Sequence, residues 1–393
     1  MKGNFIYSNP TKIYFGDDAQ TNLATALAAF GKKVLLVYGG GSIKRNGIYD
    51  DVMKALADAR KEVVELAGVM PNPTLDKLHE GCDVARRNDV DFILAVGGGS
   101  VIDYAKGVSV ATWYDGDAWD NFWVQQHDPA ADARIIPVGA VLTMAGTGSE
   151  MNGGSVITNT AAKMKLTKAF SDRVMPRFAI MNPRYTFSLP TYQLAAGIYD
   201  TFSHIMEQYF SGDDDSTSDY LAEGLMRSVI ASSRVAVKDP KDYEARSNLM
   251  WSATWALNTL IGKGKRQDWM PHMIGKGISA LTDATHGMTL SGIAVAYYRH
   301  IMPYGLPRFA RFARNVWDIH CDGLSETQQA EAGIDALAAW IREIGAATDI
   351  ASLGVTPDLI PAIADATILN GGGYKSLDRD DVVSILLASL PTN

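Results

Sequence analysis

The sequence predicts a Rossmann-like open parallel α/β sheet in the N-terminal half and an all-helical C-terminal half. Up to about residue 188, short apolar runs rich in β-branched residues alternate with amphipathic helical patterns, which is typical of buried parallel strands joined by helices. From residue 189 onward, long segments rich in Ala, Leu and Met follow without a strand pattern. We therefore expect two domains, 1–188 and 189–393, as suits a chain of 393 residues.

Apolar runs followed by glycine or threonine mark the expected strands, and helical periodicity marks the segments between them. The expected strands are residues 33–38 (KVLLVY), 91–96 (DFILAV) and 134–141 (RIIPVGAV). The expected helices are residues 19–30, 49–60, 75–87, 220–237, 243–260 and 330–344. In the N-terminal half these elements form βαβ units, in which ligands bind beyond the carboxyl ends of the strands.

Three polar, glycine-rich segments follow the three expected strands. They are Gly39-Gly40-Gly41-Ser42, Gly97-Gly98-Gly99-Ser100 and the stretch from Thr143 to Glu150. Glycine lets the backbone approach a phosphate closely, and a helix that follows offers free N–H groups. A single run is equally well a tight turn, and neither GGGS run matches the G-x-G-x-x-G or P-loop pattern. Three runs at strand ends favour one long ligand with several phosphates, such as a dinucleotide.

The first glycine run also bears on the type of dinucleotide. NAD sites usually place an acidic residue on the ribose 2′-hydroxyl. The run after residues 33–38 contains no acidic residue and continues with Lys44 and Arg45. These cations tolerate a 2′-phosphate, which favours NADP(H); the plainer interpretation is a solvated helix start.

Two pairs of residues in the helical half have the chemistry of metal ligands. Asp200 and His204 lie four residues apart, so a helix puts both on one face, and carboxylate with imidazole suits Fe²⁺ or Zn²⁺. His272 and His286 would be about 21 Å apart in an unbroken helix, too far to share one ion. A helix break within residues 281–285 would let them converge. Spacing alone favours the plainer interpretation, an exposed pair and two unrelated histidines.

Composition excludes several other classes of protein. The net charge of −8 argues against nonspecific nucleic-acid binding. Cys82 and Cys321 are the only cysteines, which excludes a disulfide framework and suits a reducing compartment. The N-terminus lacks a signal-peptide pattern, and no apolar stretch approaches the roughly 18 residues of a membrane span. We expect a cytoplasmic enzyme that contacts neither nucleic acid nor membrane.

A series of short motifs extends along nearly the whole chain. They are residues 9–16 (NPTKIYFG), 38–42 (YGGGS), 71–74 (PNPT), 97–103 (GGGSVID), 147–152 (TGSEMN), 200–204 (DTFSH), 268–272 (DWMPH) and 285–287 (THG). In this order they resemble the metal-dependent (iron-containing, group III) alcohol dehydrogenases, in particular the NADP-dependent butanol dehydrogenase and aldehyde reductase branch. The resemblance implies a dehydroquinate synthase-like fold with a nucleotide-binding α/β domain and a helical metal-binding domain. It also implies a homodimer.

The resemblance assigns roles to individual residues. It implies one divalent metal, Fe²⁺ or Zn²⁺, held by Asp200, His204, His272 and His286. It implies NADP(H) bound by Gly39, Gly40, Gly41 and Ser42 near the adenosine, by Gly97, Gly98, Gly99, Ser100 and Asp103 at the pyrophosphate, by Thr143 and Thr147 beside the nicotinamide, and by Lys165 or, with a shifted alignment, Lys163. The NAD-preferring branch has an aspartate about where Gly39 stands.

One position departs from the family pattern. Many members have a second histidine four residues after the third metal ligand, near the nicotinamide and the proton path, where this chain has Lys276. The ordinary pKa of lysine, about 10.4, does not suit a proton shuttle at neutral pH, although burial beside a cation lowers that pKa. Lys276 is therefore a candidate catalytic group, a holder of a negatively charged substrate or cofactor group, or an ion-paired side chain.

The implied reaction is hydride transfer between the nicotinamide and a small primary alcohol or aldehyde, with the metal polarising the substrate oxygen. One alternative is a metal-dependent sugar-phosphate lyase of the dehydroquinate synthase type. That chemistry needs more cations around the metal than the segments supply, which are Lys263, Lys265, Arg266 and Lys276. The other alternative is a relative that binds metal and cofactor without turnover.

Overall fold

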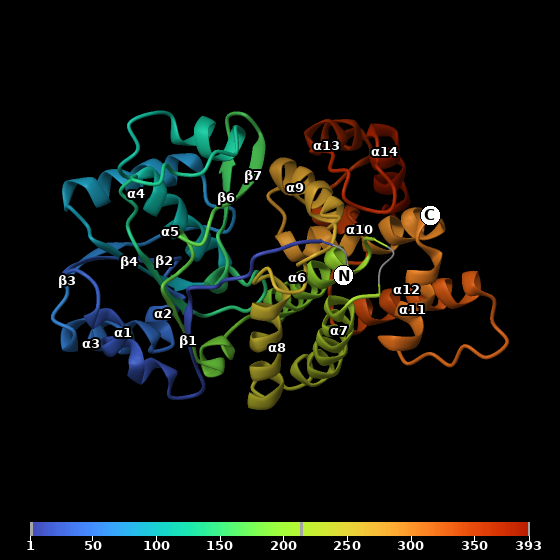
Figure 1. The fold of residues 1–393 in the computed structure, drawn as a ribbon, viewed down its shortest axis with the longest axis horizontal. Coiled ribbons are helices and arrows are strands. Elements are labelled where there is room, and N and C mark those ends of the chain that lie inside the picture. Colours follow the sequence, from blue (N-terminus) through green and yellow to red (C-terminus); the bar gives the residue numbers. More distant parts are fainter. Residues whose placement is uncertain (1–2, 213–214, 392–393) are drawn as a thin grey trace. The chain divides into compact units, whose positions relative to one another are not determined.

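The computed structural model describes residues 3–212 and 215–391. The chain divides into two compact units, Ser8–Leu189 and Pro190–Asn393, and residues 3–7 belong with the second. Strands gather in the first unit and helices make up the second (Figure 1). An α/β unit followed by a helical unit confirms the predicted fold class.

Within the described part of the first unit, six parallel strands form one sheet in the order β1-β8-β5-β4-β2-β3. The strands are β1 (Lys12–Phe15), β2 (Lys33–Tyr38), β3 (Glu62–Leu66), β4 (Phe92–Gly97), β5 (Val138–Leu142) and β8 (Phe178–Met181), and a separate antiparallel hairpin contains β6 (Gly154–Asn159) and β7 (Met164–Ala169). The predicted strands are confirmed as β2, β4 and β5, although β5 begins at Val138 and residues 134–137 of the third prediction are not strand. The sequence pattern missed β1 and β3 because these edge strands carry polar residues, and it missed β8 because that strand has only four residues.

Helices cover both faces of this sheet, because successive side chains of a strand point to opposite sides. Even-numbered residues of β2 and β4 share one core with α1 (Leu23–Ala28) and α3 (Ile48–Asp58). On the other face, α5 (Gly99–Ala111) contacts β4 and β5, and α4 (Leu75–Arg87) packs against α5. Figure 1 shows this two-sided arrangement, which leaves the carboxyl ends of the strands for the connecting loops.

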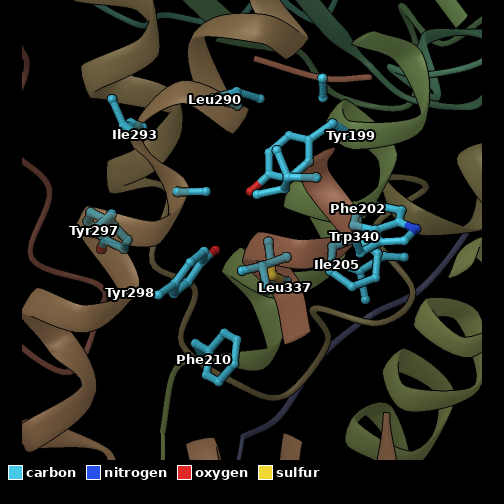
Figure 2. Packing of buried hydrophobic residues seen from close by; sticks show 14 of the residues in the cluster. Tyr199, Phe202, Ile205, Phe210, Leu290, Ile293, Tyr297, Tyr298, Leu337 and Trp340 are labelled. Atoms are coloured by element: carbon cyan, nitrogen blue, oxygen red, sulfur yellow. The ribbon is translucent and has the colours of Figure 1, made fainter. Parts of the chain in front are cut away.

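The described part of the second unit is helical and has its own apolar core. Its helices are α6 (Thr191–Tyr209), α7 (Thr217–Ala236), α8 (Tyr243–Ala256), α9 (Met270–Thr282), α10 (His286–Ile301), α11 (Leu306–Asn315), α12 (Glu326–Glu343), α13 (Ile360–Ala366) and α14 (Arg379–Ala388). Figure 2 shows aromatic side chains of α6, α10 and α12 in this core, where the Phe202 and Trp340 ring centroids are 4.5 Å apart. Every residue of α6 from Leu194 to Tyr209 is buried, so its polar side chains are buried too. Across the described residues, no helix is both long enough and apolar enough to cross a membrane.

A break separates α9 from α10 within the stretch where the sequence predicted one. α9 ends at Thr282, Asp283 adopts a left-handed conformation with φ of 55°, and α10 begins at His286. The N–H of Asp283 donates to the carbonyl oxygen of Ser279 at 2.9 Å, which closes the last turn. The break redirects the chain, so His272 and His286 are not held at the separation of a continuous helix.

We predict that the break depends on the conformation of Asp283. Asp283→Gly should leave the free energy of unfolding near the wild-type value, because glycine enters the left-handed region readily. Asp283→Val should lower it by about 1–2 kcal/mol, because a β-branched residue disfavours positive φ. Urea unfolding at pH 7 measures both variants, and a Val variant as stable as the Gly variant would contradict the prediction.

Candidate metal and cofactor sites

Three helices bring the four predicted ligand residues of the helical unit together. Asp200 and His204 lie one turn apart on α6, His272 lies in the first turn of α9, and His286 is the first residue of α10. The Nε2 atoms of His204, His272 and His286 lie 3.6, 3.7 and 3.7 Å from Oδ1 of Asp200. Asp200, His204 and His272 are buried, and 25% of the His286 side chain is exposed. The cluster is therefore closed on the side of α6 and most accessible at His286.

The cluster fits a divalent cation. Separations of 3.6–3.7 Å are longer than hydrogen bonds. Ligand atoms about 2.0–2.2 Å from a tetrahedrally coordinated ion lie about 3.3–3.6 Å from one another, which is close to the separations here. One carboxylate and three imidazoles form a donor set suited to Fe²⁺ or Zn²⁺.

Gly287 allows the start of α10 to approach α6. A Cβ atom built on Gly287 would lie 2.1 Å from the carbonyl oxygen of Ala196. A side chain at this position would push the first turn of α10 away from α6, and with it His286 away from Asp200. The glycine of the sequence motif THG therefore serves packing.

Glu207 has a buried carboxyl group that no sequence pattern indicates. Its Oε1 lies 2.5 Å from Nδ1 of His272, and its Oε2 accepts the backbone N–H of the same residue at 3.2 Å. The Ser203 hydroxyl donates to Oε1 at 2.6 Å. Burial raises the pKa of the Glu207 carboxyl to about 8, and the bonds from Ser203 and His272 oppose this rise. With Nδ1 directed at Glu207, the other ring nitrogen of His272 is the one that faces Asp200.

Lys276 lies one turn after His272 on α9 and is buried. Its positive charge acts on Glu207, where it lowers the pKa of the carboxyl against the effect of burial. Lys276, which departs from the family pattern, therefore lies close enough to act electrostatically on Glu207, the residue that orients His272.

In the other unit, the three glycine-rich segments lie along one edge of the sheet. The parallel strands β2, β4 and β5 end in register, because Tyr38 pairs with Val96 and Gly97 pairs with Leu142. The N–H of Thr143 also donates to the carbonyl oxygen of Gly97 at 3.0 Å. The edge therefore offers the three segments to a single extended ligand.

The first two segments differ in the space around their glycines. Gly41 has a φ of 89° and precedes α2 (Ser42–Arg45). Apart from chain neighbours, no atom of the described residues lies within 4 Å of a Cβ built on Gly40 or Gly41. A Cβ on Gly99 would lie 2.3 Å from Oγ1 of Thr147, so Gly99 admits the third segment against the start of α5. The open backbone at the first segment and the helix start at the second suit the phosphates of a dinucleotide.

Asp103 points into the protein. Its Oδ1 accepts the Ser149 hydroxyl, and its Oδ2 accepts the N–H of Val156 at 3.1 Å. The Nζ of the fully buried Lys106 lies 3.5 Å from Oδ1 and donates to the carbonyl oxygens of Ser149 and Asn152 at 3.1 and 3.2 Å. The buried pair thus fixes the end of the third segment against α5. These contacts show Asp103 holding the third segment, and its assignment to the cofactor by the resemblance stays a prediction.

The two candidate lysines of the hairpin occupy different positions. Lys165 is buried on β7, and its Nζ donates to Oδ1 of Asn72 at 2.6 Å, in the connection that leaves the carboxyl end of β3. Lys163 is exposed in the turn before β7, with a φ of 52°. Lys165 therefore lies beside the edge that carries the glycine segments.

Lys44 has an acidic neighbour that the sequence order concealed. Its Nζ lies 3.7 Å from Oε2 of Glu65 in β3, and 5.2 and 4.5 Å from the ring centroids of Tyr38 and Tyr49. The two tyrosine hydroxyls donate to Glu65 at 2.7 and 2.8 Å, and these bonds hold the pKa of Glu65 below its ordinary value. An ionised carboxylate therefore stands beside the first glycine segment, supplied by the neighbouring strand.

Comparison with known proteins identifies the class. A sequence profile described as iron-containing alcohol dehydrogenase matches residues 10–183. A second profile, for the C-terminal part of the Fe-containing alcohol dehydrogenase family, matches residues 194–390. This chain belongs to the iron-containing alcohol dehydrogenase family, which confirms the resemblance seen in the sequence motifs.

Individual relatives match most of this chain's length. The probable NADH-dependent butanol dehydrogenase 1 of Bacillus subtilis (strain 168) is 41% identical over 390 residues, which span 98% of this chain and 100% of that protein. The NADPH-dependent aldehyde reductase of Escherichia coli (strain K12) is 36% identical over 362 residues, 92% of each chain. The crystal structure of NADH-dependent butanol dehydrogenase A from Thermotoga maritima has a TM-score of 0.92 and 37% identity, covering 99% of both chains. The names of these relatives include both nicotinamide cofactors.

We predict that the buried pair of α5 contributes strongly to stability. Lys106→Met should lower the free energy of unfolding by about 3–5 kcal/mol, because it leaves the Asp103 carboxylate buried without its countercharge. Adding Asp103→Asn should recover part of the loss, since the double variant buries no charge. Urea unfolding of the single and double variants measures both effects, and wild-type stability of the single variant would contradict this assignment.

Proposed function

We propose that this protein is a metal-dependent alcohol dehydrogenase and aldehyde reductase that transfers hydride between NADP(H) and a small primary alcohol or aldehyde. In this proposal, residues 1–188 form the dinucleotide-binding domain and residues 189–393 the metal-binding domain. The observation that carries it is the convergence of three imidazole nitrogens on the carboxylate of Asp200. The relatives named butanol dehydrogenase and aldehyde reductase support the substrate class.

The residues of this chain bind, orient and balance charge. When bound, a divalent metal polarises the substrate oxygen and the nicotinamide gives or accepts the hydride. Asp200 supplies the negative charge of the ligand set, and Glu207 fixes which ring nitrogen of His272 is available. Lys276 adds a positive charge one turn from His272, where it can hold a proton or a negatively charged group.

The central prediction concerns metal and turnover. Chelated protein should not oxidise NADPH with butyraldehyde, and reloading with Fe²⁺ or Zn²⁺ should restore the reaction, because the substrate oxygen then has a Lewis acid. Asp200→Ala should fail to recover with either metal, while NADPH binding measured by fluorescence stays unchanged. Wild-type protein that binds metal and NADPH without turning over a panel of aldehydes would contradict the proposal and favour the non-catalytic alternative.

We propose a modest preference for NADPH over NADH. Gly39 leaves its position without a carboxylate and Lys44 stands nearby, which suits a 2′-phosphate, whereas Glu65 partly offsets that lysine. Lys44→Gln should lower the ratio of kcat/KM for NADPH to that for NADH by about 5-fold, and Glu65→Gln should raise it by a similar factor, as expected for exposed charge pairs. The kcat/KM for NADH serves as the internal control. Ratios that do not respond to either substitution would contradict this cofactor assignment.

A further prediction tests the departure from the family pattern. If Lys276 acts on the reacting groups, Lys276→Met should lower kcat by about 100-fold or more at unchanged metal content, because a positioned proton or charge is lost. Lys276→His should retain activity and introduce a step in the pH profile of kcat at about pH 6.5, the ordinary pKa of histidine. Wild-type kinetics of the Met variant would reduce Lys276 to an ion-paired structural residue.

The proposal also includes that the protein forms a homodimer and is located in the cytoplasm. β1 is an edge strand, and within the described residues its outer side pairs with no other strand, which offers a second copy an edge for association. Cys82 and Cys321 are both free thiols, which suits a reducing compartment.

A further inference from the structure

Trp269 has a backbone conformation that is unusual for a bulky residue. It directly precedes α9 with φ of 65° and ψ of 3°, in the left-handed region. L-residues with large side chains avoid this region, so it persists only where the surroundings impose it. The proposed metal chemistry does not by itself explain why a tryptophan is held in this conformation.

The preceding residue is fixed from three directions. The N–H of Asp268 donates to the carbonyl oxygen of Glu207 at 2.9 Å, and the Tyr297 hydroxyl donates to the Asp268 carboxylate. The amide side chain of Asn370 donates to the carbonyl oxygen of Asp268 at 2.7 Å. These partners come from α6, α10 and the connection before α14, so the packed unit holds the backbone at Trp269.

This conformation places the indole against two of the proposed ligands. The indole centroid lies 5.4 Å from that of the His272 ring at 83°, an edge-to-face contact, and 6.2 Å from that of the His204 ring at 60°. The ring centroids of His204 and His272 lie 4.7 Å apart. The indole N–H donates to Oε1 of Gln267 at 2.8 Å, which prevents the ring from turning away.

We propose that Trp269 is a positioning residue that holds the imidazoles of His204 and His272 with their Nε2 atoms toward Asp200. Glu207 restrains the Nδ1 side of His272, and the indole restrains the ring orientation that a single hydrogen bond leaves adjustable. The strained, left-handed backbone conformation of Trp269 brings the indole to this place. The inference rests on the proposed metal site and adds a residue that belongs to neither the ligand set nor its hydrogen-bonded partners.

Titration of chelated protein with Co²⁺, followed by visible absorption, tests this role with Co²⁺ as the probe. Trp269→Ala and Trp269→Gly should each raise the Kd about 10–100-fold, the range for residues that orient ligands, and should alter the Co²⁺ bands at saturation. Trp269→Gly should melt no lower than Trp269→Ala without metal, because glycine accepts the positive φ. Equal losses of affinity in these two variants assign the effect to the ring.

Two less disruptive variants keep the test informative if Trp269→Ala and Trp269→Gly do not fold. Trp269→Phe keeps an aromatic ring and should raise the Kd less than Trp269→Ala does. Gln267→Ala frees the indole N–H without removing the ring and should raise the Kd in the same direction. Trp251→Phe is the matched control, because this tryptophan lies on α8 and is 40% exposed.

The outcomes separate this inference from the proposed function. Folded Trp269 variants that bind Co²⁺ within twofold of wild type and with the same bands would overturn the positioning role alone. If wild type and Trp251→Phe both bind no Co²⁺, the proposed metal site fails and this role fails with it. Weaker binding and shifted bands in the Trp269 variants, beside a normal Trp251→Phe control, support the role.

Discussion

The carboxylate of Asp200 is the constraint around which the helical unit is organised. One of its oxygens faces Nε2 atoms of three histidines at 3.6–3.7 Å, so α6, α9 and α10 must approach a single point. A buried carboxylate among imidazoles is costly unless positive charge compensates it. The divalent metal of our proposal supplies that charge. Two residues allow the helices to approach this point. Gly287 leaves room for α10 to pack against α6, and Asp283 turns the chain between α9 and α10.

In the α/β unit, strand pairing rather than a shared carboxylate brings separate segments together. Parallel register brings the ends of β2, β4 and β5 to one edge, so loops far apart in sequence lie side by side without any shared ligand. The buried Lys106 and Asp103 then fix one of these loops against α5. In the helical unit, hydrogen bonds from Ser203 and His272 hold the buried carboxyl of Glu207. In both units, buried polar groups thus restrain the segments that carry the proposed ligands and phosphate contacts.

The sequence revealed those parts of the fold whose signal is local. β2, β4 and β5 are continuous apolar runs because both faces of the central sheet are covered, whereas the edge strands β1 and β3 are partly exposed and lack that pattern. The poor helix formers before His286 indicated the break, and the motifs indicated the family. Glu65 and Glu207 gave no such signal, because Lys44 and His272, on which they act, lie on elements that are distant in sequence.

By itself the sequence determined the α/β and helical halves, the central strands β2, β4 and β5, the three glycine-rich segments and the shared face of Asp200 and His204. All of these follow from periodicity or from spacing within one element. The motif resemblance implied that His272 and His286 join that face, but spacing did not, and only the tertiary structure shows how they reach it. The tertiary structure alone also decided that Glu207 orients His272 across 65 residues, and that Glu65 stands beside Lys44. These contacts depend on how separate helices and strands pack, and packing is set by the whole core rather than by any segment that a sequence pattern describes.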